Sequence, residues 1–130
     1  MDDEYLPEYD DLCYKIKRGK IEEVKEHFRK NKDFNPKLAM KPNGDTILHV
    51  CAEFDQTAIL EWAMNHWRHK KIFADEQNEA GETPLMIAAR EGKFNTVNII
   101  LTQFKKGIHV DRKSKDGWTA LFYAAHNGWM

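Results

Sequence analysis

Serine and cysteine, the usual nucleophiles of hydrolytic enzymes, are scarce in this sequence. Serine occurs once, at Ser114 in a polar stretch, and neither of the two cysteines, Cys13 and Cys51, lies in a recognisable motif. Two such distant cysteines do not form a disulfide framework, and they suit a reducing compartment. Because a free cysteine is usually a small buried hydrophobe, we expect core thiols, no catalytic residue and no enzyme activity.

Long apolar runs are also absent. No run approaches the roughly 18 residues that a membrane-spanning helix requires, and the acidic N-terminus resembles neither a secretory signal nor a transit peptide. The 130 residues fit one domain, and an apolar fraction of 42% is enough for a hydrophobic core. We therefore expect a folded intracellular protein, located in the cytoplasm, without membrane insertion.

An excess of charge of one sign is missing as well, since the formal net charge is −1. That balance gives no general reason to expect nucleic acid or an acidic membrane as a partner. The charge is nevertheless uneven: residues 1–11 hold six acids and no base, whereas residues 12–41 hold ten basic and four acidic side chains, a net of +6. Glu22 and Glu26 lie three or four positions from basic residues, which is typical of a solvated helix face. The alternatives are that the basic stretch 15–41 contacts phosphates, that the acidic segment 1–11 folds back on it, or that this segment is a tail that docks elsewhere.

Motifs for cofactor and metal binding are not found. The glycines occur singly rather than in a phosphate-binding loop. His66 and His69 could share a helix face, but a metal site needs three or four ligands and the others are lacking. Glu22 and Glu23 are adjacent and point in different directions, unlike an acid–base pair. We therefore expect no cofactor and no metal.

What the sequence does contain is an internal repeat. The pattern Gly-x-Thr-x-Leu, followed by two small residues, begins at Gly44, Gly81 and Gly117, which are 37 and 36 residues apart. A second marker keeps the same period, with spacings of 36, 37 and 36 residues, and extends it towards the N-terminus. This marker consists of Gly19, Asp55, Gly92 and Gly128. Two markers with one period indicate a repeat array.

The complete repeat units carry the local signals of two helices. The glycine of the first marker suits a tight turn, the threonine after it can cap a helix, and Pro84 takes the favoured first helical position. The second marker is expected to end that helix in the left-handed conformation, which Asp55 tolerates better than most residues. A second helix follows, with an apolar stripe along one face. The stripes consist of Ile21, Val24 and Phe28; of Ile59, Ala63, Met64 and Trp67; and of Val97, Ile100, Leu101 and Phe104.

These residues resemble the ankyrin-repeat family, whose hallmark is Thr-Pro-Leu-His-x-Ala at a period near 33 residues. Thr83-Pro84-Leu85 and Thr46-Ile47-Leu48-His49 each keep part of that motif. The resemblance is strong over 43–130 and weak over 12–42, and it implies an all-α, ankyrin-type solenoid of stacked helix–turn–helix repeats, with about three helix pairs and a final half repeat. The expected domains are an acidic N-terminal segment, 1–11, and a single ankyrin-repeat domain, 12–130, with units at about 12–42, 43–79, 80–115 and an incomplete 116–130.

The chain departs from the family pattern in two ways. The period is longer, and we place the extra residues at the end of the second helix or in the following loop, near 66–71 and 104–106. The sequence also stops at Met130, two residues after the glycine that should precede a second helix. Because a repeat cannot bury its apolar face alone, we expect further repeats to continue the C-terminal end or another chain to cover it.

The resemblance also implies a binding surface. In such stacks the turn tips and the exposed side of the first helices form an extended concave face. Phe54 and Trp118 are the expected anchors, because aromatic side chains often anchor interfaces; the alternative is that each packs against its own neighbouring repeat. The residues that the family pattern places on this face are Asp45, Glu53, Phe54, Glu82, Arg90, Glu91, Trp118, His126 and Asn127.

The expected function is a protein–protein interaction scaffold or adaptor that binds partners through the concave face. The repeat architecture, the balanced charge and the lack of catalytic groups favour it. The alternatives are an N-terminal regulatory or targeting region of a larger enzyme, channel or transporter, and a structural subunit of a large complex. The incomplete last repeat keeps these alternatives open, and the sequence does not identify the partner.

Overall fold

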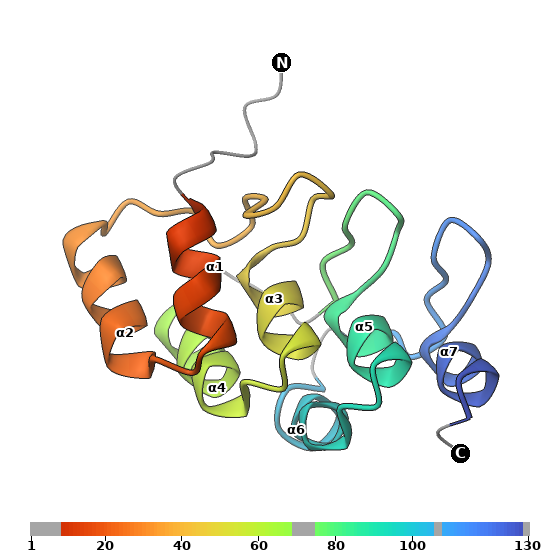
Figure 1. Cartoon of the computed structure of the whole chain (residues 1–130). Coiled ribbons are helices and arrows are strands. Elements are labelled where there is room, and N and C mark those ends of the chain that lie inside the picture. Colours follow the sequence, from red (N-terminus) through yellow and green to blue (C-terminus); the bar gives the residue numbers. More distant parts are fainter. Residues whose placement is uncertain (1–8, 69–74, 106–107, 129–130) are drawn as a thin grey trace.

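The computed structural model describes residues 9–68, 75–105 and 108–128, which form seven helices and no strands (Figure 1). Among these residues there are three helix pairs and a last, single helix, so the predicted all-α ankyrin-type solenoid is confirmed. The helices are α1 (Tyr9–Lys17), α2 (Ile21–Lys30), α3 (Ile47–Glu53), α4 (Thr57–His66), α5 (Pro84–Arg90), α6 (Phe94–Gln103) and α7 (Ala120–His126).

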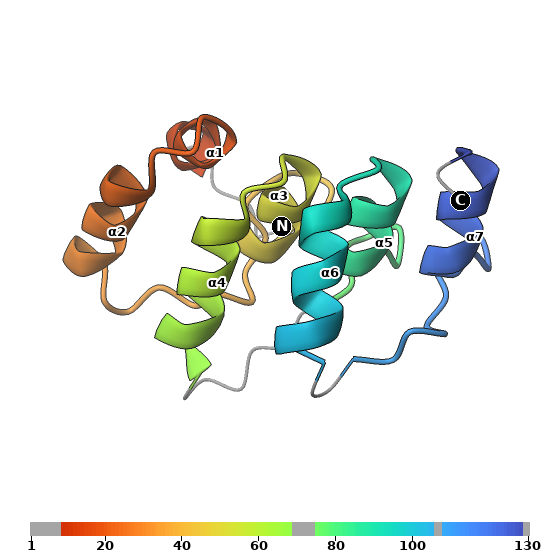
Figure 2. The ribbon, with the colours of Figure 1, turned by 90° about the horizontal axis from the view of Figure 1, so that it is seen from below.

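The helices lie in two rows (Figure 2). The first row contains α1, α3, α5 and α7, and the second contains α2, α4 and α6. Neighbours within a row are in contact, and each helix of the second row packs against the helix that precedes it in the chain. Long loops before α3, α5 and α7 project together to one side of the first row (Figure 1). The period in the sequence is therefore the step from one helix pair to the next.

Threonine begins the first-row helices, as the repeat pattern predicts. α3, α5 and α7 each start one residue after Thr46, Thr83 and Thr119. The hydroxyl of Thr83 accepts a hydrogen bond from the amide of Met86 at 3.2 Å, and the hydroxyl of Thr119 accepts one from the amide of Phe122 at 3.2 Å. Each of these bonds satisfies an N–H group that has no partner within its helix.

The second marker ends the first-row helices in the left-handed conformation, as predicted. Gly19, Gly92 and Gly128 have φ angles of 72°, 70° and 78°, and Asp55 has a φ of 56°. A side chain strains the backbone in this region, but the Asp55 carboxylate makes bonds that a glycine lacks. It accepts hydrogen bonds from the amide and the hydroxyl of Thr96, at 3.2 and 2.7 Å. Asp55 therefore ties the end of α3 to the start of α6.

The hydrophobic core fills the space between the two rows. The predicted apolar stripes of α2 and α4 are largely buried, with Val24, Phe28 and Ile59 at most 2% exposed. The stripe of α6 is buried only in part, because Ile100 is enclosed whereas Leu101 remains 38% exposed. Leu101 lines an open groove beside α7, on the side where no described helix of the second row follows α6.

One expected boundary differs from the structure. Helix α1 begins at Tyr9, so the last three residues of the predicted acidic segment 1–11 belong to the first helix. Tyr9 is 8% exposed, and its ring packs edge-on against Phe34 with 5.8 Å between the centroids. Helices α4 and α6 end at His66 and Gln103, so residues 67, 68, 104 and 105, which we expected to hold part of the extra length, follow the second helix. Residues 69–71 and 106, which we expected to hold part of the extra length, lie outside the described residues.

Candidate partner-binding surface

The loops that precede the first-row helices are joined to one another through their backbones. The amide of Glu79 donates to the carbonyl of Asn43, and the amide of Lys115 donates to the carbonyl of Ala80, both at 2.9 Å. A turn glycine permits this approach, because a Cβ atom on Gly81 would lie 2.8 Å from the backbone nitrogen of Lys115. Each loop is therefore held in place by the loop of the next repeat.

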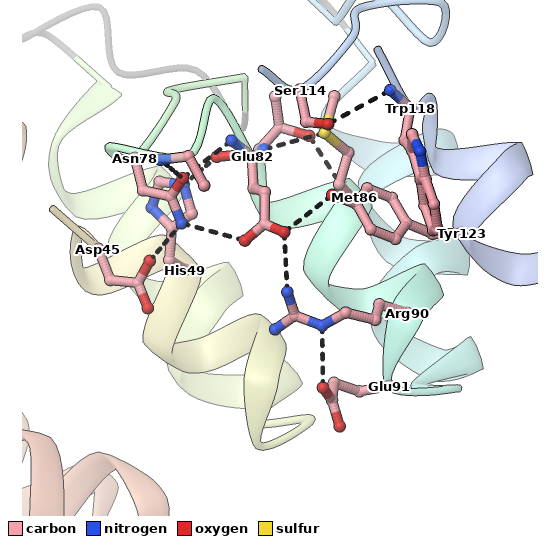
Figure 3. A network of polar contacts seen from close by, with 12 residues as sticks. Asp45, His49, Asn78, Glu82, Met86, Arg90, Glu91, Ser114, Trp118 and Tyr123 are labelled. Carbon is pink, nitrogen blue, oxygen red and sulfur yellow. Dashed lines mark hydrogen bonds and ion pairs between the residues drawn. The ribbon is translucent and has the colours of Figure 1, made fainter. Parts of the chain in front are cut away.

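Below the loops, a network of polar side chains crosses three repeats (Figure 3). The side-chain amide of Asn78 donates through Nδ2 to the carboxylate of Asp45 at 2.8 Å and to that of Glu82 at 3.3 Å. The other carboxylate oxygen of Glu82 accepts hydrogen bonds from the guanidinium of Arg90 and the hydroxyl of Tyr123, both at 2.9 Å. Glu82 thus links the loops to α5 and α7, and it fixes the positions of the side chains around it.

His49 lies at the centre of the same network and is fully buried. Its Nδ1 atom accepts a hydrogen bond from the amide of Thr46 at 3.0 Å, so its Nε2 atom carries the proton that it donates to the carbonyl of Glu82 at 2.8 Å. Burial lowers the pKa of His49 and outweighs the nearby Asp45 carboxylate, which acts to raise it. The imidazole is therefore a neutral connector between two repeats.

Two of the nine residues expected on the concave face, Asp45 and Glu82, are largely buried and bonded to other residues of the stack. Asp45 is 2% exposed, with Asn78 and Lys41 as partners, and the side chain of Glu82 is 14% exposed. The expectation that Asp45 faces solvent is wrong, and that for Glu82 holds only in small part. The physical reason is that a buried carboxylate needs partners: Asp45 is bonded to Asn78 in the next loop, and Glu82 to Tyr123 on the next first-row helix.

Glu53 and Phe54 are half-buried at the end of α3. Glu53 pairs with the ammonium of Lys41 at 3.2 Å. Burial acts to lower the pKa of Lys41, but the carboxylates of Glu53 and Asp45 together raise it by more than burial lowers it. The net shift of the pKa is therefore upward. The ammonium of Lys17 lies 5.4 Å from the centroid of the Phe54 ring. Phe54 therefore contacts α1, as the packing alternative predicts, and keeps part of its surface in solvent.

The other expected residues come together on α5 and α7. The Trp118 ring lies 4.4 Å from the ring of Phe122 and 4.9 Å from that of His126, measured between centroids. The side-chain amide of Asn127 donates to the carbonyl of Arg90 at 3.0 Å, and Arg90 also pairs with Glu91 at 3.0 Å. We call this group the α5–α7 cluster. It consists of Glu82, Arg90, Glu91, Trp118, Phe122, His126 and Asn127.

Phe122 is the member of the α5–α7 cluster that the family pattern did not indicate. It is 47% exposed, whereas the residues at the same place in the two preceding repeats, His49 and Met86, are at most 2% exposed. The available signal was its position in the last unit of the sequence, next to the predicted aromatic anchor Trp118. The next residue, Tyr123, is only 7% exposed, and its hydroxyl donates a hydrogen bond to Glu82.

A second exposed apolar surface lies at the C-terminal end of the stack. It is a groove of about 470 Å³ between α6 and α7, lined almost wholly by apolar side chains. Leu121, Val110 and Phe94 are 64%, 59% and 56% exposed. The residues that line this C-terminal groove are Leu85, Ala89, Phe94, Val97, Leu101, Val110, Asp111, Thr119, Ala120, Leu121 and Ala124.

Comparison with known proteins agrees with this geometry. A family model for ankyrin repeats, in three copies, matches residues 12–114 and 71–130. The chain belongs to the ankyrin-repeat family. It is 30% identical over 114 residues to an ankyrin repeat protein of Rickettsia bellii, covering 85% of this chain and 15% of that protein. It is also 30% identical over 99 residues to alpha-latroinsectotoxin-Lt1a of Latrodectus tredecimguttatus, covering 75% of this chain and 6% of the toxin. The chain thus spans a small part of the length of these relatives.

The fold of this ankyrin stack is also found in solved structures. One similar chain comes from the crystal structure of the yeast ribosomal protein Rps3 in complex with its chaperone Yar1. The TM-score is 0.77 at 20% sequence identity, and the superposition covers 98% of this chain and 88% of the other. Ankyrin repeats are generally modules for protein–protein interaction and are typically not enzymes. The α5–α7 cluster and the C-terminal groove are therefore assessed as binding surfaces.

The two cysteines of the ankyrin stack, Cys13 and Cys51, are partly and fully buried. Burial raises the pKa of the Cys13 thiol to about 11 and also raises that of Cys51, so both thiols are protonated near neutral pH. Within the described ranges, no three His, Cys, Asp or Glu side chains gather as metal ligands. His69, half of the His66–His69 pair, lies outside those ranges. No helix in the described part of the chain is long and apolar enough to cross a membrane.

Proposed function

We propose that this ankyrin stack is a scaffold or adaptor that binds a protein partner through its concave face, chiefly through the α5–α7 cluster. The observation that carries the proposal is the aromatic group of Trp118, Phe122 and His126, which is packed internally and still exposes Phe122 to 47%. Aromatic side chains held in this way lose little conformational freedom on binding, and they are enriched among the residues that dominate binding energy.

The surroundings of the aromatic group support a specific surface. Arg90 and Glu91 present opposite charges beside it, and Asn127 adds an amide that bonds to the backbone of the preceding repeat. Glu82 pairs with Arg90 at 2.9 Å, so the guanidinium is positioned before a partner arrives. Charges at the rim of an apolar contact select partners more than they add affinity. Phe54 extends the surface towards α3 as a second, weaker anchor.

The experiment has two steps. The partner is first captured from the native cell by affinity purification and identified by mass spectrometry. Its affinity is then measured for Trp118→Ala, Phe54→Ala and, as a matched control, Tyr14→Ala, with folding checked by circular dichroism. Tyr14 is also an exposed aromatic residue, 53% exposed, but it lies on α1. We expect a loss of tenfold or more for Trp118→Ala, a smaller loss for Phe54→Ala and no change for Tyr14→Ala. Unchanged affinity in the first two variants would exclude both anchors.

A second candidate function is supported by the C-terminal groove and by the lengths of the relatives. We propose that the stack is a regulatory, targeting or structural region of a larger protein or complex, in which the second helix of the fourth repeat, the one that begins with α7, fills the groove. That helix would pack against α7 and α6 in the way that α6 packs against α5 and α4. Sedimentation of the 130-residue chain tests this candidate. We expect self-association through the exposed groove, whereas a stable, monodisperse monomer would contradict it.

A further inference from the structure

A different pocket is lined by the C-terminal halves of α2 and α4 and by Lys32, which follows α2. The two helices are neighbours in the second row (Figure 2). The volume of the pocket is about 410 Å³, and it includes none of the residues of the concave face. Three of its side chains are cationic, three are aromatic and one is an imidazole. The residues that line this α2–α4 pocket are Lys25, Phe28, Arg29, Lys32, Trp62, His66 and Trp67.

The floor of the α2–α4 pocket is a rigid aromatic layer. Phe28 and Trp67 are 2% and 3% exposed, and their rings meet edge-on with 4.8 Å between centroids. Trp62 is only partly buried and lies nearly parallel to Phe28, at 5.9 Å. The exposed imidazole of His66 stacks on Trp62 at 4.6 Å with an interplanar angle of 17°. A planar or apolar side chain entering the pocket would therefore meet ring surfaces that are already fixed by the core.

The rim of the α2–α4 pocket is positive. Lys25 has one distant carboxylate partner, Glu22 at 3.8 Å, and Arg29 pairs with Glu26 on the outer face of α2. Lys32 has no ion pair among the described residues, and no carboxylate lines the pocket. A ligand carboxylate at the rim would thus meet three cations and no buried like charge, which is favourable for an anion over an aromatic floor.

The acids of α2 restrict which anion fits. Glu22, Glu23 and Glu26 lie on the same helix as the rim and confine its positive charge to the region near the pocket. An extended nucleic-acid backbone needs a continuous basic track, and along α2 it would meet these carboxylates. A short peptide segment needs only one apolar residue for the floor and a few acids for the rim.

We propose that the α2–α4 pocket binds an acidic linear segment of a partner protein, with an aromatic side chain against Trp62 and flanking carboxylates at Lys25, Arg29 and Lys32. The surface is independent of the concave face, because the two share no residue and lie on different rows of helices. Loss of either one therefore leaves the other proposal standing.

The probe is a synthetic hexapeptide, Glu-Asp-Glu-Phe-Asp-Glu, acetylated and amidated, titrated into the full 130-residue chain by calorimetry. We expect Lys32→Glu and Arg29→Glu each to weaken binding about tenfold, and the two together more than each alone. The matched control is Lys113→Glu, an exposed lysine at the opposite end of the chain, which should leave the affinity unchanged. Circular dichroism checks that each variant remains folded.

Two comparison ligands decide between occupants. A peptide with alanine in place of phenylalanine should bind at least fivefold more weakly, and a hexathymidine oligonucleotide should bind more weakly than the acidic peptide. Equal affinity of both peptides, or the same affinity in Lys32→Glu as in the unchanged chain, would overturn the proposal. Tighter binding of the oligonucleotide would overturn it in favour of single-stranded nucleic acid.

Discussion

The second and fourth repeats carry the same sequence pattern, and each forms a seven-residue first helix, α3 or α7. The two helices nevertheless differ sharply in how far their side chains are buried. The leucine of the pattern is 0% exposed at Leu48, 4% at Leu85 and 64% at Leu121. The following residue shows the same change, since His49 is fully buried and Phe122 is 47% exposed. The pattern therefore determines the helix, whereas the neighbouring repeat determines whether the helix is buried. Exposure at the α7 end is a property of position in the array.

The turn glycines show the same contrast. A Cβ atom on Gly44 or Gly81 would press against the next loop at 3.0 or 2.8 Å, whereas one on Gly117 would have no atom within 4 Å. All three glycines have positive φ angles, so the backbone requirement is shared. What differs is the close approach of the following repeat, which is present in the middle of the stack and absent at its described end.

The largest expected difference in the free energy of unfolding is between substitutions of Leu48 and Leu121, the most buried and the most exposed leucines of the pattern. Leu48→Ala should lower the free energy of unfolding by about 2–5 kcal/mol, because it leaves a cavity in the core. Leu121→Ala should change it by less than about 1 kcal/mol, because the side chain is mostly exposed. Urea denaturation followed by circular dichroism measures both. Equal losses in the two variants would show that another surface covers Leu121 in solution.

The turn glycines give the next largest difference. Gly81→Ala should destabilise the stack by about 2–4 kcal/mol, since the new Cβ adds a backbone clash to the strain of a positive φ angle. Gly117→Ala has the strain alone and should cost about 1 kcal/mol. Thermal unfolding of both variants checks the order. A cost for Gly117→Ala as large as that for Gly81→Ala would contradict the close packing of each loop against the next one.

A smaller difference separates the two carboxylates that bind Arg90. Glu82→Ala should cost about 2 kcal/mol, because it removes the shared acceptor of Arg90, Asn78 and Tyr123 inside the network. Glu91→Ala should cost less than about 0.5 kcal/mol, since its ion pair with Arg90 is exposed to solvent. The measurement is the midpoint of urea unfolding. A neutral Glu82→Ala variant would show that the network only fills space.

The smallest effect is the pH dependence caused by His49. Its pKa is lowered in the folded chain, so below the unfolded pKa of about 6.5 the unfolded chain binds the proton more readily and stability falls as the pH decreases. The slope that one such group contributes is at most about 1.4 kcal/mol per pH unit. His49→Gln should flatten the stability profile between pH 7 and 5, and His126→Gln, at an exposed position, is the matched control. Parallel profiles for all three chains would contradict the neutral, buried imidazole.

The fold could be predicted from the sequence because its determinants are local. A turn glycine and a capping threonine recur in three units and a left-handed residue in all four, and each acts within a few residues of its own position. The start of α1 at Tyr9 could not be predicted in this way, since it depends on the contact between Tyr9 and Phe34, which lies 25 positions later in the numbering.

The candidate surface could be predicted only in part, because burial depends on contacts between distant positions. Asp45 is buried by its bond to Asn78, and Glu82 by its bond to Tyr123, 33 and 41 residues further along the chain. A family pattern places both residues beside a turn but does not show these partners. Trp118, His126 and Asn127 lie at the two ends of a single short helix, and the rings of Trp118 and His126 are in contact, whereas their role in partner binding stays a prediction.

The most direct test of the proposed binding surface is hydrogen exchange of the stack with and without its captured partner. The account predicts that protection on binding concentrates in α7 and at the end of α5, at residues 118–127 and 90–91, with weaker protection near Phe54. Protection confined to α2 and α4, with no change in α5 and α7, would contradict the assignment of the partner to the concave face.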